Sequence, residues 1–198
     1  ALDGATALVG AKEEGWPAGS DFGAAYVFVR GGSTWSQQAK LASDIGGEDR
    51  EFGRSVALSG DTALVGAPYA GVSGSAFAFI RSGTAWGQQA ILTPGDGGDG
   101  DEFGYAVALD QDTARVGAPG DDIPGVGEVA GSAYVLLRSG TNWTQDAKLV
   151  SGDGAVEDHF GWSVALADEI ALVGNPADDT AAGIDAGSVH ALAREGSV

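Results

Sequence analysis

The sequence predicts an all-β fold assembled from repeated four-stranded units, and two observations support this. Within the stretch from Phe103 to Leu149, four short β-like runs are separated by turn residues. The same stretch recurs along the chain, most visibly as Phe-Gly beginning at residues 52, 103 and 160. A period of roughly 50 residues with four strands per period is the signature of a propeller blade. We therefore predict a β-propeller with about four four-stranded blades in this chain.

We interpret residues 1–198 as a single repeat domain, because each blade buries its face against its neighbour. The first copy begins within strand one at Ala1, and the last ends at Val198 before any tryptophan strand. We therefore expect three, four, four and three strands, and a piece of a larger ring of about seven or eight blades. The remainder of a longer polypeptide, or self-association with a second copy, would complete that ring. The copies are residues 1–42, 43–92, 93–149 and 150–198.

The alternation of large and small side chains predicts the individual strands. In the second copy, Val56 and Leu58 point to one face and Ser55 and Ala57 to the other. Small residues opposite large ones let the sheets pack at the narrow centre of a ring. The expected strands are 6–11, 24–30 and 35–41; 52–58, 62–67, 75–81 and 86–92; 103–109, 113–119, 131–138 and 141–149; and runs that start at residues 160, 170 and 188.

Composition and charge exclude several classes of function. Glycine accounts for 34 of 198 residues and has no collagen period, which indicates turn-rich β structure. The net charge is −18, which argues against nucleic acid and anionic membrane surfaces as partners, because both attract cationic patches. The chain has no cysteine for a disulfide. No apolar run approaches the ~20 residues that span a bilayer, so we expect no insertion into the membrane.

The motif residues resemble a known repeat. Phe52-Gly53 with Gly66-Ala67-Pro68, and Phe103-Gly104 with Gly117-Ala118-Pro119, resemble FG-GAP repeats, which form the blades of integrin α-subunit heads and of many bacterial secreted or surface proteins. The tail from Gly83 to Leu92 resembles a bacterial subtype of the repeat. The resemblance implies an extracellular or cell-surface β-propeller that serves adhesion or ligand binding and often binds calcium.

The chain departs from the integrin calcium pattern, which is an Asp-x-Asp-x-Asp-Gly turn between strands one and two. Its own turns, such as 110–112, are too short to wrap an ion that prefers six to eight oxygens. If calcium binds, we expect it in the connection before the Phe-Gly strand, where glycines interleave the carboxylates of Asp96, Asp99 and Asp101. A plain solvated turn is the alternative, because Asp-Gly is also a common sequence in turns. No other cofactor is expected.

The loops between strands two and three vary most in length, and variable loops on a repeated scaffold are where recognition normally lies. We therefore predict ligand contacts there, against the alternative of simple drift in loop length. Trp16 is an apolar residue in such a loop, and it either contacts a ligand or packs onto its own blade. The acidic candidates in these loops are Asp121, Asp122, Glu128, Asp178, Asp179 and Asp185.

Two further sets of residues recur in phase, and we interpret both as structural. Tryptophans at 35, 86 and 143 open the fourth strands, and arginines at 30, 81, 138 and 194 close the third strands. Catalysis finds no support, since the two histidines, His159 and His190, stand in no recognisable motif and no nucleophile elbow occurs. We therefore expect a non-catalytic adhesion or recognition propeller for a protein or carbohydrate ligand. The alternative is a structural scaffold module of a surface layer or filament.

Overall fold

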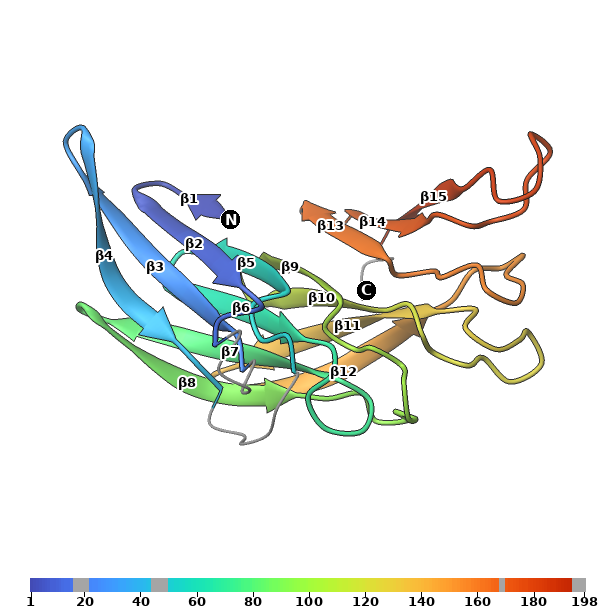
Figure 1. The fold of residues 1–198 in the computed structure, drawn as a ribbon, viewed down its shortest axis with the longest axis horizontal. Helices are drawn as coiled ribbons and strands as arrows, with labels where there is room; N and C mark the ends of the chain where they lie inside the picture. Colours follow the sequence, from blue (N-terminus) through green and yellow to red (C-terminus); the bar gives the residue numbers. More distant parts are fainter. Residues whose placement is uncertain (16–21, 44–49, 168–169, 194–198) are drawn as a thin grey trace.

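The computed structural model describes residues 1–15, 22–43, 50–167 and 170–193, which form an open arc of four antiparallel sheets (Figure 1). Three sheets have four strands and the last has three. No helix in the described part of the chain could cross a membrane. The strands are β1 (Leu2–Asp3), β2 (Thr6–Ala11), β3 (Ala24–Gly31) and β4 (Thr34–Leu41); β5 (Ser55–Ser59), β6 (Thr62–Ala67), β7 (Ser75–Ser82) and β8 (Ala85–Leu92); β9 (Ala106–Asp110), β10 (Thr113–Ala118), β11 (Ser132–Ser139) and β12 (Asn142–Leu149); and β13 (Ser163–Ala167), β14 (Ile170–Asn175) and β15 (Ser188–Ala193).

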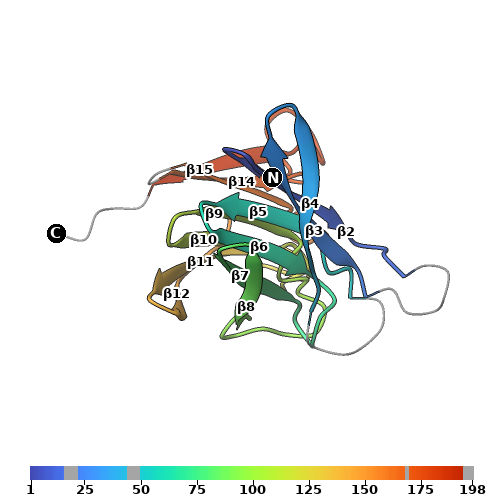
Figure 2. The same cartoon turned by 90° about the vertical axis from the view of Figure 1, so that its left-hand side faces the viewer.

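Each sheet is a simple meander in which every strand pairs with the next in the chain. The first strands lie side by side at the centre of the arc, β5 against β9 and β9 against β13. Figure 2 shows the order of the second sheet, from β5 beside β9 to β8 at the outer edge. This arrangement confirms the predicted all-β fold and the blade-like sheets.

The observed strands match the expected ones closely, with two differences. The two residues Leu2–Asp3 pair with β2 and form a short strand of their own, β1. Phe52-Gly53 and its equivalents lie outside the first strands, which begin three residues after each phenylalanine. The reason is that Gly53 has a φ of 91°, in the left-handed region, while Phe52 forms a parallel bridge to Gly23 of the preceding sheet.

The motif glycines form the seam between successive sheets. The Gly104 N–H donates to the Gly117 carbonyl of its own sheet at 3.0 Å. The Gly104 carbonyl lies so close to Gly66 of the preceding sheet that a Cβ at Gly66 would stand 1.9 Å from it. The pairs Gly10–Gly53 and Gly117–Gly161 repeat this approach. Glycine is therefore required at Gly104 because its φ is positive, and at Gly66 because the neighbouring carbonyl leaves no room for a Cβ.

The hydrophobic core lies between the sheets. We call the face that packs onto the preceding sheet the leading face, and the opposite one the trailing face. Between the second and third sheets, the trailing face supplies Leu64 and Ala78, and the leading face supplies Val116 and Tyr134, with Phe103 inserted between them. Each large aromatic side chain buried in this way contributes about 2–3 kcal/mol.

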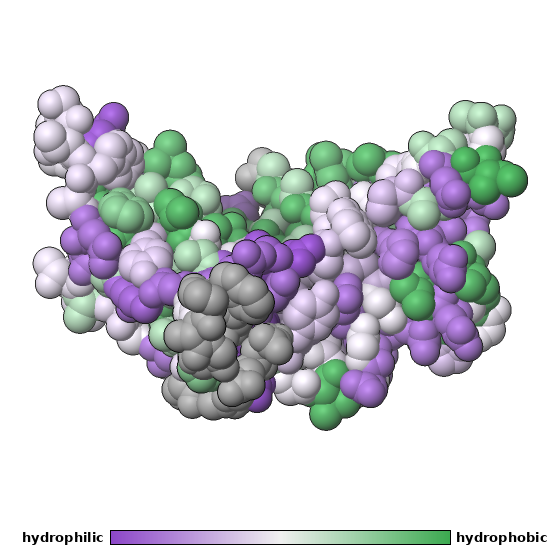
Figure 3. Space-filling view, in the orientation of Figure 1, coloured by the Kyte–Doolittle hydropathy of each residue, from purple (hydrophilic) through white to green (hydrophobic). Residues whose placement is uncertain are grey.

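Both ends of the arc expose faces that are buried elsewhere in the molecule. On the trailing face of the fourth sheet, Leu172 is 42% exposed, whereas its equivalent Leu64 is 0% exposed. Val189 is 68% exposed, and its equivalent Ala76 is 0% exposed. On the leading face of the first sheet, Val9 is likewise exposed. Figure 3 shows hydrophobic residues gathered along the hollow between the two ends.

Candidate functional site: the loop rim

In the described part of the chain, one rim of the arc carries the loops between second and third strands, together with the connections that enter the first strands. This follows from the meander, because strands two and four end where strands one and three begin. At the right of Figure 1, the loops that follow β10 and β14 project from this rim. The rim is therefore the surface on which the variable segments of the chain converge.

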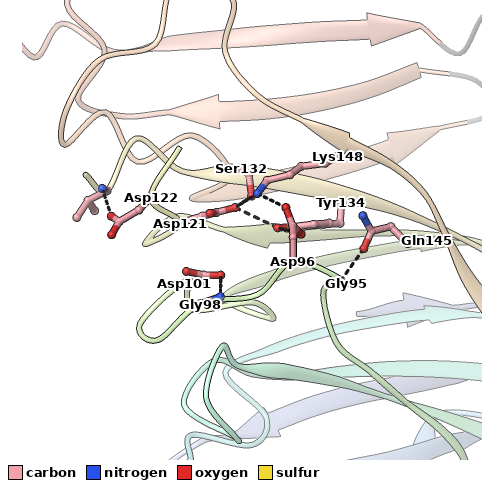
Figure 4. Close-up of polar contacts among 11 residues, drawn as sticks. Gly95, Asp96, Gly98, Asp101, Asp121, Asp122, Ser132, Tyr134, Gln145 and Lys148 are labelled. Atoms are coloured by element: carbon pink, nitrogen blue, oxygen red, sulfur yellow. Dashed lines mark hydrogen bonds and ion pairs between the residues drawn. The ribbon is translucent and has the colours of Figure 1, made fainter. Parts of the chain in front are cut away.

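A partly buried cluster of ion pairs anchors the rim of the third sheet (Figure 4). Lys148 Nζ lies 2.7 Å from Asp96 Oδ2 and 2.8 Å from Asp121 Oδ2. The Tyr134 hydroxyl lies 3.0 Å from Asp96 Oδ1 and 3.0 Å from Asp121 Oδ2, so it can donate its proton to either. The Ser132 hydroxyl also donates to Asp121 at 2.5 Å. Asp121 is thus a buried carboxylate with three donors at Oδ2.

The electrostatics of this cluster favour the charged pair. Burial acts to lower the pKa of Lys148, but hydrogen bonds from its ammonium to Asp121 and Asp96 outweigh burial and raise it. Burial likewise acts to raise the pKa of Asp96, and the bonds from Lys148 and Tyr134 lower it instead. Burial raises the pKa of the Tyr134 hydroxyl. The lysine therefore serves as a built-in cation for the two carboxylates.

The first sheet carries the same three-residue set, which we call the acid–tyrosine–lysine set. Glu14 accepts hydrogen bonds from Tyr26 and Lys40. Both hydrogen bonds lower the pKa of Glu14, and the bond from Lys40 has the larger effect. Lys40 stands opposite Tyr26 in the sheet register, as Lys148 stands opposite Tyr134.

The second sheet replaces the whole set with apolar residues. Ala70 stands where Glu14 and Asp121 stand in their copies, and Phe77 faces Ile91 in the register. Ala70 and Phe77 are fully buried. In the first three sheets, acid, hydroxyl and ammonium are therefore present together or absent together, which indicates that they act as one structural unit.

The fourth sheet holds an incomplete version. Asp178 is buried at the acid position, and His190 replaces the tyrosine, with its Nε2 4.0 Å from Asp178 Oδ2. The Ser188 hydroxyl lies 3.0 Å from the same nitrogen. Asp153, in the connection before β13, stands where Asp96 stands in the third copy. No described lysine faces His190, because the described part of this sheet ends at β15.

The structure does not gather the three aspartates that were expected to bind calcium. Asp96 faces Lys148, Asp99 is exposed, and Asp101 is buried with its Oδ2 2.6 Å from the Gly98 N–H. Within the described residues, no three His, Asp or Glu side chains are placed to hold a metal ion. Calcium binding in this connection stays a prediction, which calorimetry on an Asp99→Ala, Asp101→Ala variant would test.

Two of the predicted ligand-loop acids are exposed and also accept a backbone N–H of their own loop. Asp122 Oδ1 accepts the Val129 N–H at 2.8 Å, and Asp179 Oδ1 accepts the Asp185 N–H at 2.9 Å. These equivalent bonds hold each loop closed across its neck. Glu128 is exposed beside an open cavity of about 400 Å³ formed by residues 122–128. Trp16 lies outside the described residues.

The recurrent tryptophans connect neighbouring sheets. Trp86 Nε1 donates to Gln38 Oε1 of the first sheet at 2.9 Å, and Trp143 Nε1 donates to Gln89 Oε1 of the second at 3.1 Å. Trp86 and Trp143 also pack against the core clusters, whereas Trp35 at the open end is exposed. This supports the expected packing role.

The recurrent arginines lie over these tryptophans. Arg138 stacks on Trp143 at 5.3 Å, pairs with Asp112 at 2.7 Å and donates to Thr62 of the preceding sheet at 2.9 Å. Arg81 makes the equivalent bonds to Asp61 and Thr6. Arg194 lies outside the described residues.

These features define a blade-repeat protein with a loop-bearing rim. The model of the FG-GAP repeat family matches residues 35–79, 86–136 and 143–192, well over half of the chain. The chain therefore belongs to the FG-GAP repeat family. Each matched segment runs from an outer strand into the next sheet, so it spans the glycine seam. A comparison with curated proteins found no match.

Proposed function

We propose that this chain is part of a non-catalytic, extracellular or cell-surface recognition propeller whose loop rim binds a protein or carbohydrate ligand. The observation that carries the proposal is the arrangement of acidic and apolar side chains on the loops of the rim. The exposed acids Asp122 and Asp179 each accept a backbone N–H of their own loop. Apolar side chains are exposed at the loop tips, since Val126 is exposed beside the loop cavity and Ile184 is 82% exposed. Exposed apolar residues on fixed loops are typical of interaction sites.

Family membership supports the location and the class, because FG-GAP repeats are typical of extracellular or surface proteins. The net charge of −18 disfavours nucleic acid as the ligand. His159 lies against Pro119 and Trp162, and His190 lies against Phe160 and Ser188. Both histidines are therefore engaged in packing, which favours a binding role over catalysis.

A screen of glycans and matrix proteins, with and without calcium, tests this proposal. The informative variants are Val126→Ser and Ile184→Ser, with Ile170→Ser as the control, because Ile170 is exposed at the opposite rim. We expect at least a tenfold loss of ligand affinity for the rim variants and none for the control. Equal binding by all three variants would contradict the assignment.

A scaffold role is the second candidate, and the exposed end faces favour it. Apolar patches of this kind usually find a partner, either the remainder of a longer chain or a second copy. Light scattering at micromolar concentration separates the two roles. A scaffold predicts assembly that Ile170→Ser weakens and Ile184→Ser leaves unchanged, the reverse of the pattern expected for ligand recognition.

A further inference from the structure

An apolar patch is exposed where the loop after β10 meets the connection that enters β13. Its two valines, Val126 of the loop and Val156 of the connection, are both exposed. Each valine packs on the backbone of the other segment. A Cβ at Gly127 would stand 2.4 Å from Val156 Cγ2, and a Cβ at Gly154 would stand 3.4 Å from Val126 Cγ1. The patch therefore belongs to the third and fourth sheets together, and we call it the valine junction.

Backbone hydrogen bonds fix the two segments of the valine junction to each other. The Glu157 N–H donates to the Glu128 carbonyl at 3.0 Å, and the Phe160 N–H donates to the Ala130 carbonyl at 3.0 Å. A surface that is already fixed in the free protein loses little conformational entropy when a ligand binds. The junction is therefore a preformed surface.

The loop cavity of about 400 Å³ gives this surface an apolar hollow. Ile123, Pro124 and Val126 are among the residues that line it. A hollow of this size accepts one aliphatic or aromatic side chain. Removing the apolar surfaces of both partners from water is favourable, so such a side chain would anchor a ligand here.

The charge around the valine junction indicates the class of ligand. Residues 119–131 and 150–159 contain six Asp or Glu and no Lys or Arg. Asp122, Glu128 and Glu157 are exposed, and none of these three forms an ion pair within the described part of the chain. Cations placed opposite these carboxylates would complement their charge. The matching ligand therefore carries lysines or arginines on either side of its apolar side chain.

Two other occupants fit the valine junction less well. Residues 119–131 and 150–158 contain no aromatic ring on which a sugar could stack. A second copy of the chain would bring charge of the same sign, because the net charge is −18 and only 10 of the 198 residues are Lys or Arg. A basic segment of a partner protein is the occupant that meets both the apolar and the acidic features.

We propose, on the basis of the rim function proposed above, that the valine junction binds a segment of a partner protein in which lysines or arginines flank an apolar side chain. The apolar side chain enters the cavity beside Val126 and contacts Val156. The cations pair with Asp122, Glu128 and Glu157. The connection of the fourth sheet then belongs to the ligand site together with the loop of the third.

Fluorescence anisotropy of labelled seven-residue peptides, measured with the whole chain, tests this proposal. The probe is Gly-Lys-Lys-Leu-Lys-Lys-Gly, and two control peptides replace its leucine with serine or its four lysines with glutamate. We expect the leucine peptide to bind at least fivefold more tightly than the serine peptide, and the glutamate peptide not to bind. Binding of the leucine peptide should weaken as salt is added, because salt screens exposed charges.

Variants of the two valines test the apolar part of the site. The double variant Val126→Ser, Val156→Ser should lose the preference for the leucine peptide over the serine peptide. Val72→Ser is the matched control, because Val72 is an exposed valine of the neighbouring loop, and it should keep the preference.

Variants of the acids test the charged part. The double variant Glu128→Gln, Glu157→Gln should bind the leucine peptide at least fivefold more weakly than the wild type. The control Glu13→Gln, Asp61→Asn removes two exposed charges elsewhere, and it should change the affinity less than twofold.

Several outcomes would overturn the proposal. These are absence of peptide binding, equal binding of the leucine and serine peptides, or equal losses in the junction variants and their controls. A neutral glycan whose binding depends on Val126 would overturn it and leave ligand recognition by the rim intact, whereas a rim on which no ligand of any class depends would end both. A dimer that the double valine variant abolishes would assign the junction to self-association and overturn the proposal as well.

Discussion

Replacing Lys148 with isoleucine should destabilise the protein far more than replacing the whole acid–tyrosine–lysine set of the third sheet. The single change leaves Asp121 buried without its counter-ion, and the side chain of Asp121 is only 5% exposed. Breaking a fully buried ion pair costs about 3–5 kcal/mol. The hydroxyls of Ser132 and Tyr134 still reach Asp121, and Lys148 is partly exposed, so we expect a loss of about 2–3 kcal/mol.

The triple variant Asp121→Ala, Tyr134→Phe, Lys148→Ile installs the residues of the second sheet. It removes acid, hydroxyl and ammonium together and leaves no buried charge, so its cost should be below about 1 kcal/mol. Lys40→Ile is the matched control, because Lys40 and Glu14 are more exposed than their counterparts, and its cost should also stay below about 1 kcal/mol.

Urea unfolding followed by circular dichroism measures these free energies. A triple variant that is less stable than the single variant would refute the reasoning, because the three residues would then contribute independently. A single variant as stable as the wild type would show that the ion pair contributes nothing.

Two further predictions concern the buried acid of the connection and the glycine seam. Burial raises the pKa of Asp101 above its ordinary value of 3.8, so its contribution to stability is fully present below pH 3.8 and is lost as the pH rises through the folded pKa. Asp101→Asn should therefore be more stable than the wild type at pH 7 by an amount that vanishes below pH 3.8, and exposed Asp99→Asn is the control that removes one charge from the same connection. A difference in unfolding free energy between Asp101→Asn and the wild type that stays constant across pH would contradict this. Gly117→Ala should cost about 2–4 kcal/mol, because its Cβ would stand 1.9 Å from the Gly161 carbonyl, while Gly174→Ala meets only the Ser163 side chain and should cost about 1 kcal/mol or less. Equal thermal stability of these two alanine variants would contradict the inference that the close backbone contact between sheets requires glycine at residue 117.

Much of the fold could be predicted, because repetition reveals strand and turn positions that one copy alone would leave ambiguous. Strand β6 was expected at the residues where it lies. The placement of Phe52-Gly53 was wrong, because alternation of side chains cannot reveal that Gly53 has a positive φ and turns away from the ladder. That requires the contact with the preceding sheet, which only the assembled arc shows.

The candidate site was less predictable, because a carboxylate's partner depends on the fold. Ligand contact by Asp122 and Asp179 stays a prediction, and the structure adds that each accepts a backbone N–H of its own loop. The acid–tyrosine–lysine set was missed, although the aligned copies contain its signal. Lysine stands in the fourth strand where the third has tyrosine, and isoleucine where it has phenylalanine, as Ile91 opposite Phe77 shows.

Hydrogen exchange on the chain with a ligand identified in the screen tests the central claim, recognition by the loop rim, most directly. The account predicts slower exchange in residues 119–131 and 176–187, which contain the tips at Val126 and Ile184. It predicts no change on the trailing face around Leu172. Protection confined to β13–β15 or to the leading face at Val9, with the loops unchanged, would contradict recognition by the rim and favour assembly through the ends of the arc.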